Sequence, residues 1–184
     1  MGDSLLLWMT LALAVFWGVG VYRLMRMRAR GLDAFGSVEK HLREYAELVR
    51  EQGPTLESER TPTSPDAADD STVMWTALVA ATDHLDLALK ESRASPLQVE
   101  PMTRGVAAIV ALQHTWGALC DAPADLAGSI VPDVMPKRWE LISLSVQKSR
   151  NGLNQIVKSY NAALTQFPAS LIAGVMGFKP GGTL

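Results

Sequence analysis

One uncharged run near the N-terminus constrains this chain more than any other feature of its sequence. Residues 5–22, LLLWMTLALAVFWGVGVY, are eighteen residues without a charged side chain. As an α-helix they would span about 27 Å at roughly 1.5 Å per residue, close to the hydrocarbon thickness of a bilayer. No basic stretch precedes the run and no small-x-small cleavage motif follows it. The sequence therefore predicts a retained membrane anchor over residues 1–22, with a cleaved signal peptide as the alternative.

Charge around the anchor predicts its orientation. Only Asp3 precedes the run, whereas four arginines, called here the arginine flank, follow it: Arg23, Arg26, Arg28 and Arg30. Basic residues beside a membrane-spanning helix favour the cytoplasmic side, so we expect the N-terminus outside and the bulk of the chain in the cytoplasm. The flank is typical of a stop-transfer sequence. It also offers about 1 kcal/mol of attraction per residue to anionic lipid.

A row of small residues runs along one face of the predicted anchor. Thr10, Ala14 and Gly18 are spaced by four residues. Small residues at this spacing let two membrane helices approach closely, and they are also common in simple anchors. The row is therefore a candidate surface for transmembrane packing between two copies of the chain.

Length and composition limit the part of the chain beyond the anchor. The chain has 184 residues, of which 48% are hydrophobic, enough for one folded domain but not for two substantial ones. A formal net charge of -2 does not recommend nucleic acid as a partner. Cys120 is the single cysteine, and His41, His84 and His114 lie far apart without metal-ligand spacing. We expect no disulfide, metal or cofactor.

Apolar residues recur at spacings of three and four after the anchor, which is the pattern of amphipathic helices. A first helix is predicted to continue out of the anchor to about Gln52, where Gly53 and Pro54 stop it. The segment 53–71, rich in proline and small polar residues, is predicted to be a disordered loop. A second helix then runs from Asp70 or Ser71 to about Ser92, and a third ends at the segment CDAPADLAG. The predicted inward residues are Leu32, Phe35, Val38, Leu42, Tyr45 and Val49 in the first helix, Met74, Leu78, Ala81, Leu85 and Ala88 in the second, and Ile109, Leu112, Trp116 and Leu119 in the third.

The fourth helix is predicted to open near Pro136 and to run to Phe167, before Pro168. Its inward residues alternate spacings of three and four over about four heptads, which defines a heptad seam. The seam consists of Trp139, Ile142, Val146, Ser149, Leu153, Ile156, Tyr160, Ala163 and Phe167. Packing inside a bundle is the simplest interpretation, and contact between subunits is the alternative. The predicted fold is all-α: an N-terminal transmembrane helix that continues into a long antiparallel up-down helical bundle over residues 23–168.

Both ends of the chain resemble the LemA family, whose members join an N-terminal membrane anchor to a helical domain. The family motif has the form R-x-x-Y-N-x-x-V-x-x-Y-N, followed by F-P and G-F. The matching residues here are Arg150, Asn154, Val157, Tyr160, Asn161, Phe167, Pro168, Gly177 and Phe178. The chain departs from the pattern at Leu153, where the family has Tyr, at Ser143, where it often has Glu, and at Phe35, where Trp is usual. It is therefore similar to a divergent LemA protein.

The resemblance implies an architecture and a location. It implies a long up-down bundle tethered as a single-pass protein to the bacterial inner membrane, with the C-terminal domain cytoplasmic and with no established catalytic residues. The residues themselves agree, because Cys120 ends an apolar helix face and no nucleophile elbow or glycine-rich phosphate loop is present. We therefore expect a protein that is not an enzyme.

The apolar tail, residues 169–184, returns toward the membrane if each helix reverses direction. We expect it to pack on the bundle, with shallow insertion beside the anchor or binding to a neighbouring chain as alternatives. The favoured function is a scaffold or adaptor at the cytoplasmic face that binds its own copies or another membrane protein. The alternative is a protein that binds or shapes membrane lipid. An exposed seam would favour the scaffold, and an amphipathic tail beside the arginine flank would favour the lipid function.

Overall fold

The computed structural model describes residues 2–59, 65–122, 131, 134–167 and 169–184. Within these residues the chain forms five helices and no strand, which confirms the predicted all-α class. The helices are α1 (Gly2–Glu59), α2 (Pro65–Ala94), α3 (Val99–Cys120), α4 (Val134–Thr165) and α5 (Ala169–Met176).

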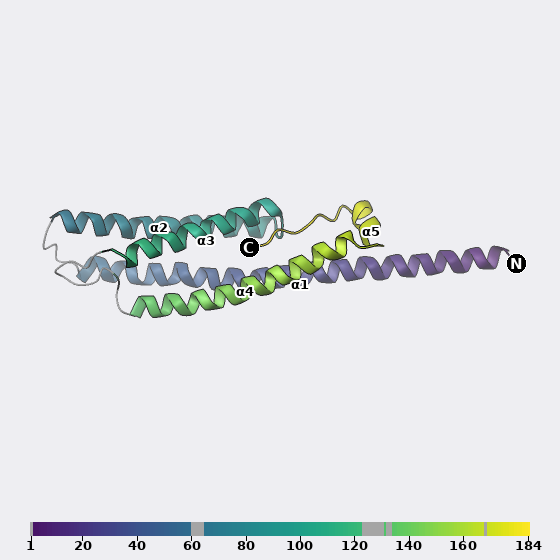
Figure 1. The fold of residues 1–184 in the computed structure, drawn as a ribbon, viewed down its shortest axis with the longest axis horizontal. Helices are drawn as coiled ribbons and strands as arrows, with labels where there is room; N and C mark the ends of the chain where they lie inside the picture. The colour runs from purple at the N-terminus through teal and green to yellow at the C-terminus, as the bar shows by residue number, and fades with distance from the viewer. Residues whose placement is uncertain (1, 60–64, 123–130, 132–133, 168) are drawn as a thin grey trace.

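Four long helices run up and down beside one another (Figure 1). Helix α1 leads away from the N-terminus, α2 returns, α3 leads away again and α4 returns, while α4 packs along α1 and α3 packs along α2. This arrangement confirms the predicted antiparallel up-down bundle. The N-terminal part of α1 extends beyond every other helix, and α5 lies where that extension begins. We call this end of the bundle the anchor end and the opposite end the distal end.

One apolar core joins the four long helices. At the distal end the ring of Trp139 in α4 stacks on Trp116 in α3, with centroids 4.2 Å apart, and lies 4.4 Å from the ring of Tyr45 in α1. Every predicted inward residue of the first three helices is buried or partly buried except Leu32, which is 38% exposed. Its neighbour Gly31 takes the inward position, against the side chain of Leu97.

The heptad seam of α4 faces the interior of the bundle along nearly its whole length. Its residues from Trp139 to Ala163 are buried or partly buried. Phe167 is the exception, because α4 ends at Thr165 and leaves this side chain 78% exposed. Val157 and Leu164, which lie outside the predicted seam, are also buried. A straight α-helix drifts by about 20° per heptad relative to a 3.5-residue repeat, so the buried stripe moves gradually to these neighbours.

The boundary between the first two helices differs from the prediction. Helix α1 passes Gly53 and Pro54 and ends at Glu59, and α2 begins at Pro65, so helical backbone covers much of the segment 53–71. One proline removes one main-chain hydrogen bond, and a helix already nucleated over many preceding turns can continue past that loss. The predicted stop at Gly53 and Pro54 is therefore wrong. The remainder of the predicted loop, residues 60–64, lies outside the described residues.

Charged side chains connect α1 to α2. The carboxylate of Glu39 is only 5% exposed and accepts hydrogen bonds from Arg93 at 2.6 Å and from Arg43 at 2.8 Å. Farther along, Arg50 donates to Asp86 at 2.5 Å. A buried carboxylate is tolerated when it is paired and hydrogen-bonded, and the two arginines supply that pairing for Glu39.

Candidate functional site

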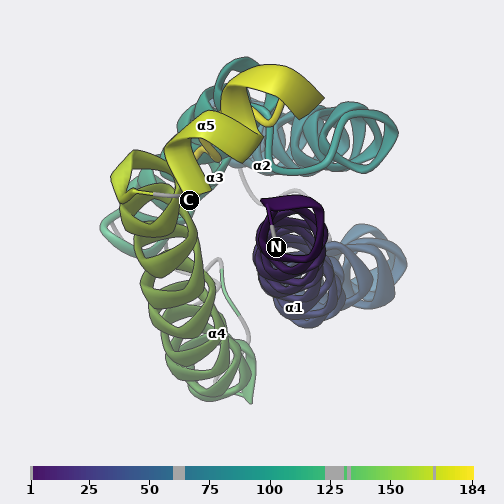
Figure 2. The ribbon, with the colours of Figure 1, turned by 90° about the vertical axis from the view of Figure 1, so that its right-hand side faces the viewer.

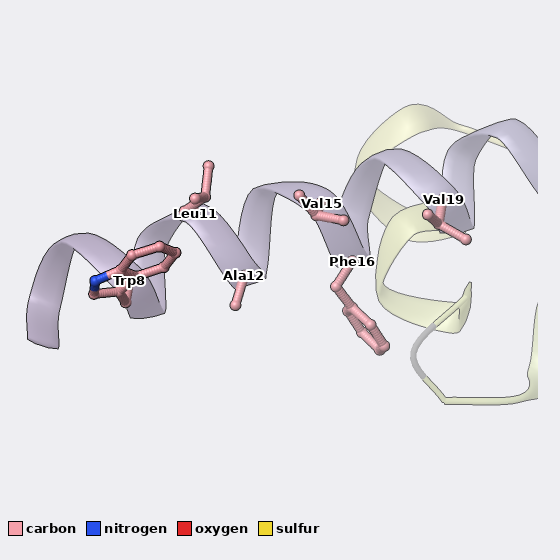
Figure 3. A pocket seen from close by; sticks show the side chains of 6 residues that line it. All are labelled: Trp8, Leu11, Ala12, Val15, Phe16 and Val19. Carbon is pink, nitrogen blue, oxygen red and sulfur yellow. The ribbon is translucent and has the colours of Figure 1, made fainter.

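The anchor region of α1 has the properties of a membrane-spanning helix. It is the one helix in the described part of the chain that is long and apolar enough to cross a membrane, and its apolar window lies near the N-terminus. A shallow hollow runs along it, and the side chains around the hollow project from α1 and are exposed (Figure 3). Lining the hollow are Trp8, Leu11, Ala12, Val15, Phe16 and Val19. A continuous apolar surface of this kind is rarely left in contact with water.

The small-residue row lies on this same uncovered stretch. Thr10, Ala14 and Gly18 are all exposed. The hydroxyl of Thr10 donates to the main-chain oxygen of Leu7 at 2.9 Å, within α1 itself. A Cβ added at Gly18 would meet no heavy atom within 4 Å. The structure thus leaves the row open along the outside of α1.

Helix α5 packs on the junction between the anchor and the bundle. Ile172 and Ala173 are buried against Leu24 of α1 and against Tyr160 and Leu164 of α4. This small cluster is separate from the main core. It covers one face of α5 and fixes the helix at the level where α1 leaves the bundle (Figure 1). In the view along the bundle from this end, α5 lies next to the end of α4 (Figure 2).

Helix α5 approaches α1 closely at a glycine. A Cβ placed on Gly20 would lie 2.5 Å from Cδ1 of Ile172, so the end of this side chain would have to turn away. Gly20 is the third residue from the end of the predicted anchor, so α5 sits beside the end of the apolar run. Leu171 and Val175 are exposed on its other side, Met176 is exposed at its end, and Phe167 is exposed just before it.

The arginine flank surrounds this contact. All four arginines are exposed, while Leu24 and Met27 between them turn inward toward α5. None of the four forms an ion pair within the described part of the chain. Arg28 lies close enough to Tyr160 to favour its ionised form, although burial is the larger influence and raises the pKa of Tyr160 above 10.0. The structure therefore brings the flank and the exposed face of α5 to the same end of the molecule.

Two asparagines of the LemA-like motif hold the last residues of the sequence. Asn154 donates from Nδ2 to the main-chain oxygen of Leu184 at 2.6 Å and accepts the N–H of Leu184 on Oδ1 at 2.9 Å. Asn161 makes the same pair with Gly181, at 2.9 and 2.7 Å. Seven residues of α-helix rise about 10.5 Å, and three residues of extended chain cover about 10 Å. The heptad spacing of the asparagines therefore matches the spacing of the residues that they hold.

The held residues lie in a groove between α4 and the connection from α2 to α3, called here the tail groove. The N–H of Gly182 donates to the main-chain oxygen of Leu97 at 2.8 Å. A Cβ on Gly182 would lie 2.8 Å from Cα of Val99, so only glycine fits there without a shift of the backbone. The side chain of Leu184 is 6% exposed and belongs to the main core. The segment 177–184 thus closes the anchor end of the bundle (Figure 1).

The other motif residues have separate environments. Val157 is buried, and the hydroxyl of Tyr160 donates to the main-chain oxygen of Lys179 at 3.3 Å. Phe178 is partly buried beside α5. Nε of Arg150 is buried without a hydrogen-bond partner among the described atoms. In the same motif, Gly177 has a φ of +68°, a left-handed conformation that favours glycine, and Pro168 lies outside the described residues.

Cys120 and the possible metal ligands are the groups of chemical interest in the described part of the chain. Cys120 lies at the surface, and partial burial of its thiol together with the charge of Asp121 raises the pKa of that thiol. A raised pKa keeps the sulfur protonated at neutral pH and makes it a poor nucleophile. Within the described ranges no three His, Cys, Asp or Glu side chains gather in a group that suits a metal ion.

Sequence reasoning named Asn154 and Asn161 as motif residues but missed the segment that they hold. The segment PGGTL, 180–184, carries a detectable signal, because two adjacent glycines suit a backbone that is pressed against other atoms. Glu39 was missed as well. Its position on the inward face of the first helix is a signal, since a buried carboxylate requires basic partners.

Comparisons with known proteins give no relative for this chain: no family model, no curated protein and no solved structure matches it. The likeness to LemA proteins stays a prediction that rests on the residues that carry it. The geometry of the anchor end is therefore the basis on which a function can be assigned.

Proposed function

We propose that this chain is a membrane-anchored, non-catalytic helical-bundle protein that acts at the membrane surface by binding anionic lipid. The observation that carries the proposal is the docking of α5 against Leu24 at the end of the anchor, with Leu171, Val175 and Met176 left exposed. In this arrangement a short apolar helix lies beside the arginine flank. Basic side chains next to an exposed apolar surface suit contact with anionic lipid.

The depth of α5 follows from its contact with Gly20. Residues 5–22 supply an apolar length of about 27 Å, which places Gly20 at the boundary between hydrocarbon and headgroups. A helix packed beside that position lies in the same boundary layer. The exposed apolar side chains of this helix then enter the acyl region, as the apolar side of an interfacial helix does.

The arginine flank completes the lipid site in this proposal. Its four exposed arginines follow Gly20 over about 4 to 15 Å of helix and have no acidic partner in the described part of the chain. Anionic headgroups at the cytoplasmic leaflet supply such partners, at about 1 kcal/mol for each basic residue. The proposed location is a bacterial inner membrane, with the N-terminus outside and the bundle in the cytoplasm.

A scaffold or adaptor role is the second candidate. The heptad seam does not supply its surface, because Trp139, Val146 and Leu153 are buried within the bundle. Support comes instead from the tail groove, which recognises an extended segment of chain. In this role the partner is a second copy of the chain or another membrane protein that presents such a segment.

Native mass spectrometry of the full-length protein, released from its own membranes, tests the lipid proposal by counting retained lipid. Replacement of Arg26 and Arg30 by glutamine removes two charges from the flank. The matched control also removes two positive charges, by replacing Lys137 and Lys148 with glutamine, since both lysines are exposed on α4 away from the flank. We expect the flank variant to lose anionic lipid while the control retains it. Equal retention in the two variants would contradict the proposal.

A further inference from the structure

The tail groove has the construction of a peptide-binding site. Its polar side chains, Asn154 and Asn161, bond only to the main chain of the segment that they hold. The main-chain oxygen of Leu97 adds a third anchoring point through the N–H of Gly182. Recognition of extended peptides commonly works in this way, with affinity from main-chain hydrogen bonds and selectivity from pockets for particular side chains.

The groove is selective for the sequence that occupies it. A Cβ at Gly182 would lie 2.8 Å from Cα of Val99 and 3.0 Å from Cβ of Met102. A Cβ at Gly181 would lie 3.2 Å from Cγ1 of Val157. Two residues later Leu184 enters the core, while the intervening Thr183 remains exposed. The preferred ligand is therefore an extended segment of the form Gly-Gly-x-Leu, which this chain contains at 181–184.

The occupying segment belongs to no helix. Residues 177–184 contain neither helix nor strand, and their described main-chain hydrogen bonds are those from Phe178 to Ala173 and from Gly182 to Leu97. Gly177, at a φ of +68°, joins the segment to α5. Departure of the segment would therefore break its hydrogen bonds to the two asparagines, Leu97 and Tyr160 and would uncover Leu184, without breaking hydrogen bonds within any helix.

We propose that the tail groove of one copy binds the 181–184 segment of a second copy, so that two anchored chains exchange their tails. Exchange of an identical segment reuses the contacts already present and needs no new complementary surface. Each groove is selective for the sequence that the other copy presents. The product is a reciprocal dimer in which each bundle is closed by the tail of its neighbour.

Membrane anchoring favours this exchange. Two copies held by α1 in one bilayer keep their grooves and tails at the same height, which raises the effective concentration of one for the other. That the grooves and tails of two copies lie at the same height above the bilayer rests on the proposed anchoring. The contacts in the tail groove and its selectivity do not rest on it. The exchange goes beyond lipid binding, since it gives the anchor end a protein partner.

Cysteine trapping between two full-length chains tests the exchange. Thr183 and Gln98 are both exposed, and each directly follows one partner of the hydrogen bond between Gly182 and Leu97. In a Cys120→Ser background, one tagged chain carries Thr183→Cys and a differently tagged chain carries Gln98→Cys. The two chains are reconstituted together in vesicles of phosphatidylglycerol and phosphatidylcholine and oxidised with copper phenanthroline. Exchange is expected to give a covalent heterodimer that dithiothreitol reverses.

Two matched controls distinguish docking from collision. Gln113→Cys places the thiol on another exposed glutamine, about 22 Å farther along α3, and Gly182→Val in the Thr183→Cys chain blocks the seating of the tail. We expect about tenfold less heterodimer in either control, because only a docked tail has a raised effective concentration. Equal heterodimer in the controls would overturn the proposal.

A chain that carries both Thr183→Cys and Gln98→Cys provides the remaining readout. If this chain closes only within itself and the mixed chains give no heterodimer, the tail stays in its own groove and the proposal is wrong. Flotation of the same vesicles measures anchoring independently. Flotation therefore shows whether a missing heterodimer comes from a chain that is not anchored or from tails that do not exchange.

Discussion

Asn161 of α4 holds Gly181 by both of its main-chain groups, at 2.9 Å from Nδ2 to the main-chain oxygen and 2.7 Å from the main-chain nitrogen to Oδ1. Asn154 repeats the arrangement one heptad earlier with Leu184. Two asparagines of the LemA-like motif thus fix an extended segment against the bundle. The same segment leads directly from α5, so it also helps to determine where that helix lies.

The asparagine contacts predict a measurable loss of stability. Asn161→Ala removes two hydrogen bonds and leaves the N–H of Gly181 unpaired, and we expect the free energy of unfolding to fall by about 1–3 kcal/mol. Asn151→Ala is the matched control, because Asn151 is exposed on the same helix. Hydrogen exchange of the full-length protein in detergent should show faster exchange at residues 181–184 in the first variant only. Unchanged exchange at these residues would contradict the assignment.

The close approach at Gly182 predicts a steric effect. Gly182→Ala would place its Cβ 2.8 Å from Cα of Val99, so the backbone must shift. We expect a cost of about 1–3 kcal/mol in the free energy of unfolding, as for other overpacked positions. Thr183→Ala, at the exposed neighbouring residue, should stay within about 0.5 kcal/mol of the parent protein. Thermal unfolding of both variants checks the difference, and similar melting of the two would argue against a tight groove.

Two substitutions of Tyr160 measure the contribution of its packing and that of its hydrogen bond separately. Its side chain is 4% exposed and joins α4 to Leu24 and Ile172. Tyr160→Ala should leave a cavity and lower the free energy of unfolding by about 2–5 kcal/mol. Tyr160→Phe keeps the ring and loses only the bond to Lys179, so the expected cost is about 0.5–1.5 kcal/mol. Denaturant unfolding of the two variants measures both values, and an unchanged Tyr160→Ala protein would place this ring on the surface.

Alkaline pH should lower the free energy of unfolding because Tyr45 is buried in its protonated form. Burial is the main cause that raises the pKa of Tyr45 above its usual 10.0, against smaller opposing effects from Ser143 and Arg150. The unfolded chain loses this proton first, so the stabilisation is complete below pH 10.0 and falls as the pH rises toward the higher folded pKa. Unfolding measured on both sides of this range should show a smaller decline for Tyr45→Phe than for the parent protein. An equal decline would exclude Tyr45 as the source.

The helices could be predicted because each has a long amphipathic pattern with a single interpretation. The rows that include Leu42 in α1 and Leu85 in α2 face the core as expected, and the seam of α4 packs inward. Helix ends were less predictable. Pro54 removes one main-chain hydrogen bond from the helix. Because α1 is already formed over many turns before Pro54, this loss does not end the helix.

The anchor end could be predicted only in outline. Reversal of direction at each helix brings α4 back toward the anchor, which is enough to place α5 near it. The partners of Asn154 and Asn161 lie 20 to 30 residues farther along the chain. They are main-chain groups of a glycine and a leucine, and every residue has such groups, so no sequence pattern marks them. An exposed amide has many equivalent partners, so its periodicity could not reveal which one it holds.

The depth of α5 in the bilayer is the measurement that tests the central claim most directly. In a Cys120→Ser background, Val175→Cys carries a fluorescent label on the exposed face of α5, and Leu144→Cys carries it on an exposed position about 30 Å from the end of α4. The full-length protein is reconstituted with phosphatidylglycerol, phosphatidylcholine and lipids that bear a quencher in the acyl chain. We predict strong quenching at position 175 and none above background at position 144. Equally weak quenching at both positions would show that α5 stays in water, and it would contradict the proposed role at the membrane surface.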